Sequence, residues 1–163
     1  AINLVITAMS APLQDEFLML VQGVPQINVV DVPMNVNQNN ASLPSHKAML
    51  QPNTARLVVE KEEFSNTETI VDATALNKEN RLTYRLRYSV VGMDNQPWTT
   101  PYWLERRTTY YSNELDRLGR ESKAEQANNS LYREMARSLL QAVLSAPRPI
   151  PTAPSSVPSL SPQ

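Results

Sequence analysis

The chain has no cysteine and is poor in glycine and histidine. Its 163 residues include no Cys, one His and three Gly, against 13 Pro. Without cysteine this sequence has no disulfide framework, no thiolate metal site and no thiol nucleophile. A glycine-rich phosphate loop and a nucleophile beside a base are missing as well. The composition therefore argues against an enzyme.

Long hydrophobic runs are missing too. No apolar run approaches the roughly 18 residues that a membrane-spanning helix needs, and no signal peptide opens the sequence. The sequence starts at Ala1 inside a strand-like run, and we therefore expect it to be a trimmed piece whose processing signals lie upstream. Its 41% hydrophobic and 19% charged residues are typical of one globular domain.

Charge is distributed unevenly along the chain. Residues 1–77 carry three Lys or Arg against eight Asp or Glu, whereas residues 78–137 carry eleven against eight. The basic part is mainly arginine, whose planar guanidinium suits phosphate groups. This distribution favours an anionic partner, although the same arginines would also fit an ordinary solvated strand face.

The stretch from Arg81 to Tyr111 predicts a long antiparallel hairpin. Residues 81–91 alternate strictly between apolar and polar, which is typical of a half-buried strand. Residues 92–96 have turn chemistry, and residues 98–111 are rich in Thr, Tyr and Trp. Both tryptophans and five of the six tyrosines lie in this hairpin, so we expect most of the buried aromatic area there.

The segments before the hairpin predict a βαβ-like start and a further strand. Residues 2–8 and 27–32 have strand character, and the apolar spacing between them predicts a helix that ends at Gly23. Residues 33–54 lack an apolar period and predict a long loop. Residues 55–75 predict a strand with a bulge or bend at 62–66, followed by a turn at 77–80.

The segment after the hairpin predicts one long helix that covers the sheet. An apolar stripe runs from about Glu121 until Pro147 stops it: Ala124, Ala127, Leu131, Met135, Leu139, Ala142 and Val143. Residues 147–163 predict a disordered, proline-rich tail after a single domain of residues 1–146. The expected fold is α+β, an α/β roll whose mostly antiparallel sheet of four to five strands has two helices packed on one face.

The order and spacing of these elements resemble a known family. The likeness is carried by the alternating strand 82–90, the second strand 104–113, Leu118-Gly119-Arg120 and the helical segment 131–140. In these the chain is similar to the LptE family, the lipopolysaccharide-assembly lipoproteins of the Gram-negative outer membrane. The family's mature chain begins with a lipid-modified Cys that this sequence does not contain.

The resemblance implies a role without enzymatic chemistry. Proteins of this family sit as a plug inside the lumen of the LptD β-barrel, on the periplasmic side of the outer membrane, help that barrel assemble and bind lipopolysaccharide. It also implies a lipid anchor on the upstream Cys, and no other cofactor. Family positions that meet lipopolysaccharide correspond to Lys78 or Arg81, near the hairpin tip, and to Arg120. Arg85 and Arg87 would extend this patch or pair with acids of the barrel wall.

Two other readings follow from the residues themselves. Arg85 and Arg87 share a hairpin with aromatics, as in modules that bind RNA or single-stranded nucleic acid on a sheet face. Against this, the alternation puts Tyr84 and Tyr88 on the opposite face, and the isoelectric point is about 5.9. For an enzyme, the glutamates at 60, 62 and 63 would have to be acid and base, whereas their pattern favours a solvated edge.

Overall fold

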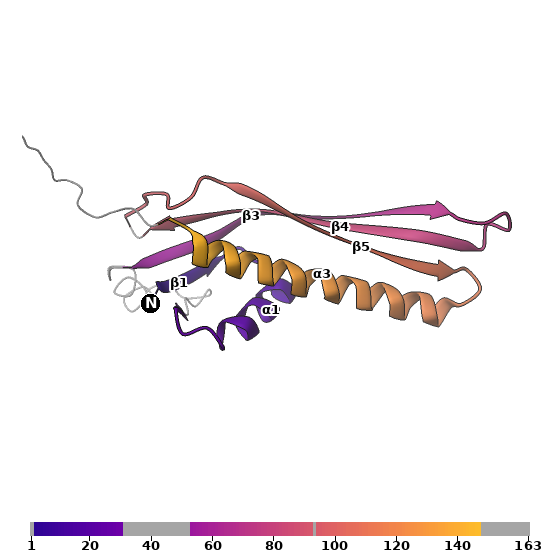
Figure 1. The fold of residues 1–163 in the computed structure, drawn as a ribbon, viewed down its shortest axis with the longest axis horizontal. Helices are drawn as coiled ribbons and strands as arrows, with labels where there is room; N and C mark the ends of the chain where they lie inside the picture. Colours follow the sequence, from indigo (N-terminus) through magenta and orange to yellow (C-terminus); the bar gives the residue numbers. More distant parts are fainter. Residues whose placement is uncertain (1, 31–52, 93, 148–163) are drawn as a thin grey trace, which may run out of the picture.

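The computed structural model describes residues 2–30, 53–92 and 94–147, which form one mixed five-stranded sheet and two helices (Figure 1). The strands lie in the order β2-β1-β3-β4-β5. Helices α1 and α3 lie on the same side of the sheet and pack against each other. The α+β class with two helices on one face is therefore confirmed.

The N-terminal segment forms the predicted βαβ unit. Strand β1 (Ile2–Thr7) pairs in parallel with β2 (Ile27–Val29), and α1 (Ala11–Val21) connects them. Strand β1 also pairs in parallel with β3, from Asn3 to Thr7, which joins this unit to the rest of the sheet. The predicted helix stripe is buried, through Leu13, Phe17 and Val21.

Three long antiparallel strands make up the rest of the sheet. They are β3 (Thr54–Ile70), β4 (Asn77–Gly92) and β5 (Tyr102–Asn113). The apolar residues of β4 that alternate in the sequence all face the helices and are buried: Leu82, Tyr84, Leu86, Tyr88 and Val90. The predicted hairpin and its buried face are confirmed.

Strand β3 has its bulge at Glu60 and not at residues 62–66, so that part of the prediction was wrong. The register shifts between Val59 and Lys61. Before the bulge the odd-numbered residues face the core, and after it the even-numbered residues do, starting with Glu62 opposite Leu86. One extra residue exchanges the two faces of a strand. The alternation that looks disturbed in the sequence is regular but shifted.

The turn between β3 and β4 lies at residues 71–76, whereas the sequence predicts it at 77–80. Asp72 accepts a hydrogen bond from the Thr74 hydroxyl at 2.9 Å, which closes the turn earlier. Asn80 is 1% exposed, and its side-chain amide donates to a serine hydroxyl on β5 at 2.9 Å. A buried amide with a partner is stable within a sheet, and the sequence does not reveal that partner.

Helix α3 (Arg117–Ser145) begins before Glu121, where the stripe predicts its start. The Asp116 carboxylate caps it by accepting the Gly119 N–H at 2.9 Å. A Cβ at Gly119 would lie 2.1 Å from a carboxylate oxygen of Asp116, so a larger residue would displace the capping side chain. The buried face of α3 otherwise follows the prediction closely and consists of Ala127, Leu131, Met135, Ala136, Leu139 and Val143.

The aromatic residues are less buried than the sequence predicts. Tyr84 and Tyr88 on β4 lie in the core. On β5, by contrast, Tyr102, Trp103 and Tyr111 are 54%, 41% and 58% exposed. Trp103 and Tyr111 lie opposite Arg87 and Glu79, on the side of the sheet away from the helices, and β5 is also the edge of the sheet, so its side chains have less cover.

The predicted loop 33–54 lies outside the described residues except for its last two, and the second of these, Thr54, begins β3. The predicted tail 147–163 lies outside them apart from Pro147. The division into a domain of residues 1–146 and a tail therefore stays a prediction.

The long strands and α3 extend past the βαβ unit (Figure 1). Strand β1 pairs with β3 only as far as Val58, so the second half of β3 continues beyond it. The end of the molecule where β3 and β5 finish and β4 and α3 start is called the distal end here, and it comprises residues 68–80 and 109–123.

Candidate functional site

Lys78 and Arg120 meet at the distal end through one carboxylate. Lys78 is in the first residues of β4, Glu114 follows β5, and Arg120 is in the first turn of α3. Lys78 Nζ lies 2.8 Å from Glu114 Oε2, and Arg120 Nη1 lies 3.0 Å from Glu114 Oε1. Lys78 Nζ is also 3.7 Å from Glu68 Oε1. Two of the five predicted cations are thus brought together.

The ion pair shifts the pKa of both partners. The hydrogen bond from Lys78, together with its charge and that of Arg120, lowers the pKa of the Glu114 carboxyl. The hydrogen bond to Glu114 raises the pKa of the Lys78 ammonium against an opposing effect of desolvation. Both groups are therefore charged at neutral pH, and two cations are held next to each other.

We expect acid to remove the contribution of Glu114 to stability. A carboxyl whose pKa is lowered on folding stabilises the protein above its unfolded pKa, and this contribution disappears as pH falls through the folded pKa. Wild-type protein should therefore have a higher Tm than Glu114→Gln at pH 7, and the difference should close below the ordinary carboxyl range. Thermal melts of both proteins from pH 7 to pH 3 measure this. A difference that does not change with pH would contradict the assignment.

The distal end also exposes apolar side chains. Five of the ten large hydrophobic residues that are exposed in the described part of the chain lie there: Ile70, Val71, Tyr111, Leu115 and Leu118. Leu115 and Leu118 are 78% and 79% exposed. Exposed apolar groups that gather in one place often mark an interaction site. The distal end thus offers both cations and apolar surface.

The other three predicted cations lie on the face of the sheet away from the helices, which we call the outer face. Arg81, Arg85 and Arg87 have odd numbers in β4, opposite in direction to its buried even-numbered residues. Each one pairs with glutamates of this chain. The N–O distances are 3.3 Å for Arg81–Glu79, 3.3 Å for Arg85–Glu63, 3.5 Å for Arg85–Glu105 and 3.1 Å for Arg87–Glu60.

On the outer face the three arginines of β4 are therefore already paired with glutamates. The Arg85 guanidinium also lies 4.3 Å from the ring centroid of Trp103, in a cation–π contact. Half-exposed ion pairs are individually weak, but a network of them fixes the positions of its side chains. Nucleic-acid binding needs free aromatic faces beside free arginines, whereas here Tyr84 and Tyr88 are in the core and the guanidinium covers Trp103.

The prediction made from the sequence for Glu62 was wrong. It was expected at a solvated edge with Glu60 and Glu63, but the bulge turns it toward the helices. Its carboxylate accepts the Ser10 N–H and hydroxyl at 2.8 Å each and the Tyr84 hydroxyl at 2.6 Å. Burial, the hydrogen bond to Glu62 and its charge raise the pKa of Tyr84. Glu62 thus joins the start of α1 to β3 and to the core.

Tyr84→Phe should destabilise the protein by about 1.5–3 kcal/mol, because it removes a hydrogen bond between a buried hydroxyl and a partly buried charged group. The midpoint of urea denaturation should fall without a change in slope. Tyr88→Phe is the matched control, since Tyr88 is equally buried in β4 but its hydroxyl bonds no carboxylate in the described residues. Equal midpoints for the two variants would show that the bond to Glu62 contributes nothing.

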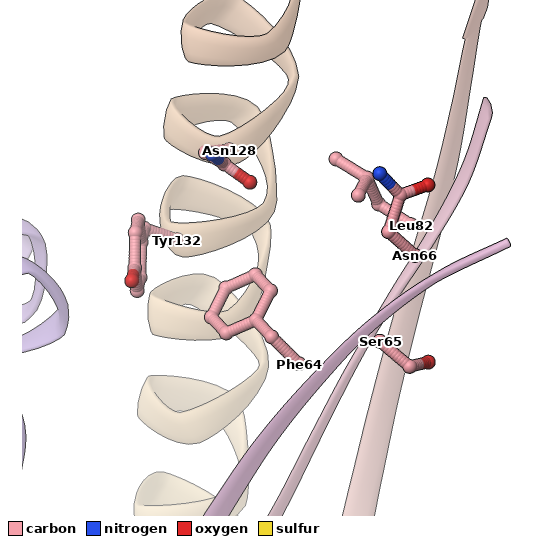
Figure 2. Close-up of a pocket in the computed structure, with 6 residues that line it drawn as sticks. All are labelled: Phe64, Ser65, Asn66, Leu82, Asn128 and Tyr132. Carbon is pink, nitrogen blue, oxygen red and sulfur yellow. The ribbon is translucent and has the colours of Figure 1, made fainter. Parts of the chain in front are cut away.

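A small pocket opens between β3 and α3 (Figure 2). Its volume is about 240 Å³, and its lining consists of Phe64, Ser65, Asn66, Leu82, Asn128 and Tyr132. Phe64 points from β3 toward α3, stacks on Tyr84 at 4.2 Å between ring centroids and meets Tyr132 edge-on at 5.2 Å. Neither asparagine side chain hydrogen-bonds another described residue. No sequence pattern indicates this pocket, because its walls come from three separate elements.

Neither a metal-binding cluster nor a membrane-spanning helix is found among the described residues. In this part of the chain no three His, Cys, Asp or Glu side chains come close enough together to hold a metal ion. Neither α1 nor α3 combines the length and the apolarity that a helix needs to cross a membrane.

Comparison with known proteins gave one family and several similar folds. The family model described as LptE, lipopolysaccharide-assembly, matches residues 9–145. No curated protein sequence matches the chain. Similar solved structures include rare lipoprotein B from Shewanella oneidensis, with 14% identity, a TM-score of 0.60 and coverage of 88% of this chain and 94% of that one.

Two more structures have the same fold. A minor lipoprotein from Acinetobacter baumannii has 14% identity and a TM-score of 0.57, with 91% of this chain and 96% of that one covered. An uncharacterized lipoprotein B from Nitrosomonas europaea has 14% identity and a TM-score of 0.58, with coverage of 89% and 85%. At this identity the likeness establishes the fold.

Proposed function

The chain belongs to the LptE family of lipopolysaccharide-assembly lipoproteins, and from this premise we propose that it plugs the LptD β-barrel and binds lipopolysaccharide at its distal end. The family match spans both helices and the four strands β2 to β5, so a role in lipopolysaccharide assembly at the outer membrane stands with it. The proposal adds the barrel as partner, the lumen as location and lipopolysaccharide as ligand, all without an enzymatic step.

The observation that carries ligand binding is the joint presence of cations and apolar side chains at the distal end. Lipopolysaccharide is an anionic amphiphile, with phosphates next to acyl chains. Lys78 and Arg120 would hold phosphate oxygens through charge-assisted hydrogen bonds, while Leu115 and Leu118 offer apolar contact. Glu114 keeps the two cations together when no ligand is bound. Arg81, the residue of β4 that directly follows the distal end, lies on the outer face.

The outer face supports the role as a plug. The interior of a large outer-membrane barrel is polar, and such barrels are often filled by an additional element. Arg85 and Arg87 are already paired with glutamates, so this part of the sheet face enters a polar lumen without leaving their charges unpaired. We therefore assign Arg85 and Arg87 to the barrel-facing surface and Lys78 and Arg120 to the ligand.

Co-expression with the barrel tests the role as a plug. The barrel should fold in higher yield when this chain is present, which its heat-modifiable mobility on gels measures, and the two proteins should then purify together. An equal yield of folded barrel with and without the chain, and no co-purification, would overturn the proposal.

A further inference from the structure

The second half of β3 is a sheet edge without a neighbouring strand. Strand β1 leaves β3 after Val58, and among the described residues no strand pairs with the β1 side of β3 from Lys61 to Ile70. On an antiparallel edge, the N–H and C=O groups of alternate residues point outward. Such an edge is a template for another strand unless it is protected. Figure 1 shows this part of β3 running beyond the βαβ unit.

The pocket opens at the same stretch of β3. Phe64, Ser65 and Asn66 belong both to the free edge and to the pocket lining. Phe64 and Asn66 face the helix side, so a residue added opposite them on a neighbouring strand would direct its side chain to the pocket side of the sheet. Figure 2 shows the space between Phe64 and Asn128, the latter on α3.

The size of the pocket distinguishes between two classes of ligand. Its volume of about 240 Å³ is below the roughly 300–1,000 Å³ typical of small-molecule sites and suits one large side chain. Recognition of a peptide by strand addition combines both observed features, a free edge for the backbone and a pocket for an alternate side chain. A sugar or an acyl chain could occupy the pocket, but it would not explain the free strand edge beside it.

We propose that the β3 edge from Lys61 to Ile70 receives an extended segment of the barrel partner as an added strand, with an apolar or aromatic side chain of that segment in the pocket. This inference rests on the proposed function. The edge carries three glutamates and one lysine, so a second copy of this chain brings like charges together while a strand with basic residues is complementary. The free amides of Asn66 and Asn128 border the position of the incoming side chain.

Hydrogen exchange on the purified complex tests this. Alternate amides between Lys61 and Ile70 should exchange at least about tenfold more slowly in the complex than in the free chain. The β5 edge, Tyr102–Asn113, is the internal control, because exchange at its alternate amides should not slow further when the complex forms. A complex that forms without alternating protection on β3 would overturn the inference and leave the proposed function intact. If no complex forms, both fall.

A pair of variants tests the pocket. Asn128→Trp fills the pocket from α3 and should weaken the complex by about tenfold or more, since the incoming side chain loses its place. Asn129→Trp is the matched control, because Asn129 is also exposed on α3 but does not line the pocket, and it should bind as wild type. Equal affinities would overturn the inference, and so would β3 protection produced by self-association or by lipopolysaccharide alone.

Discussion

Met135→Asp should leave the protein unfolded. Met135 is fully buried on the face of α3 that packs against the sheet, in a cluster with Leu131 and Leu139. An ionised carboxylate there has no partner, and an unpaired buried charge costs several kcal/mol. That is a large part of the roughly 5–15 kcal/mol by which a domain is stable. Near-ultraviolet circular dichroism should lose its native signal, and heating should show no cooperative transition.

Two controls separate the effect of a buried charge from the effects of replacing Met135 and of adding a charge to α3. Met135→Leu keeps the volume and should cost less than about 1.5 kcal/mol. Leu144→Asp puts the same charge on α3 at a position that is 38% exposed, and this variant should fold. A cooperative melt of Met135→Asp near the wild-type Tm would show that the buried face of α3 is assigned wrongly.

The double variant Lys78→Gln, Arg120→Gln should bind lipopolysaccharide about a hundredfold more weakly than wild type. Two charge-assisted contacts to phosphate are lost, and each is worth roughly a factor of ten. Glutamine is preferable to glutamate, because a reversed charge would repel Glu68 and Glu114 and disturb the distal end. Pull-down with purified lipopolysaccharide at several protein concentrations measures the change, and wild-type binding should weaken with added salt.

The matched control is Arg85→Gln, Arg87→Gln, which removes the same charge from the outer face. Both arginines pair with glutamates there and are assigned to the barrel side, so binding should stay within about twofold of wild type. If the outer-face variant lost binding while the distal variant kept it, the ligand site would have to move to the outer face. Equal binding by wild type and both double variants would show that neither pair of cations binds lipopolysaccharide.

The periodic spacing of apolar residues in the sequence predicted β4 and α3 and their buried faces. The alternation around Tyr84 and the stripe around Met135 identified the buried faces of β4 and α3, because side-chain burial repeats with the geometry of each element. The bulge was predicted at 62–66 and not at Glu60, because the shifted alternation shows that a residue is inserted but not at which position. The start of β4 was missed because Asn80 looks like a turn residue until its partner on β5 is known.

The site depended on contacts between residues far apart in the sequence. Lys78 and Arg120 were candidates through the family resemblance, but only the structure shows Glu114 between them. The same holds for Arg85 and Arg87, whose pairing with Glu63 and Glu60 depends on the register of β3 and β4. The contact of Glu62 with Ser10 required both the bulge and the docking of α1.

Electron cryomicroscopy of the co-purified complex tests the central claim most directly. The claim predicts density for the five-stranded sheet and both helices inside the barrel lumen, with the distal end next to bound lipopolysaccharide. A complex in which the lumen is empty and this chain lies outside the barrel wall would contradict it.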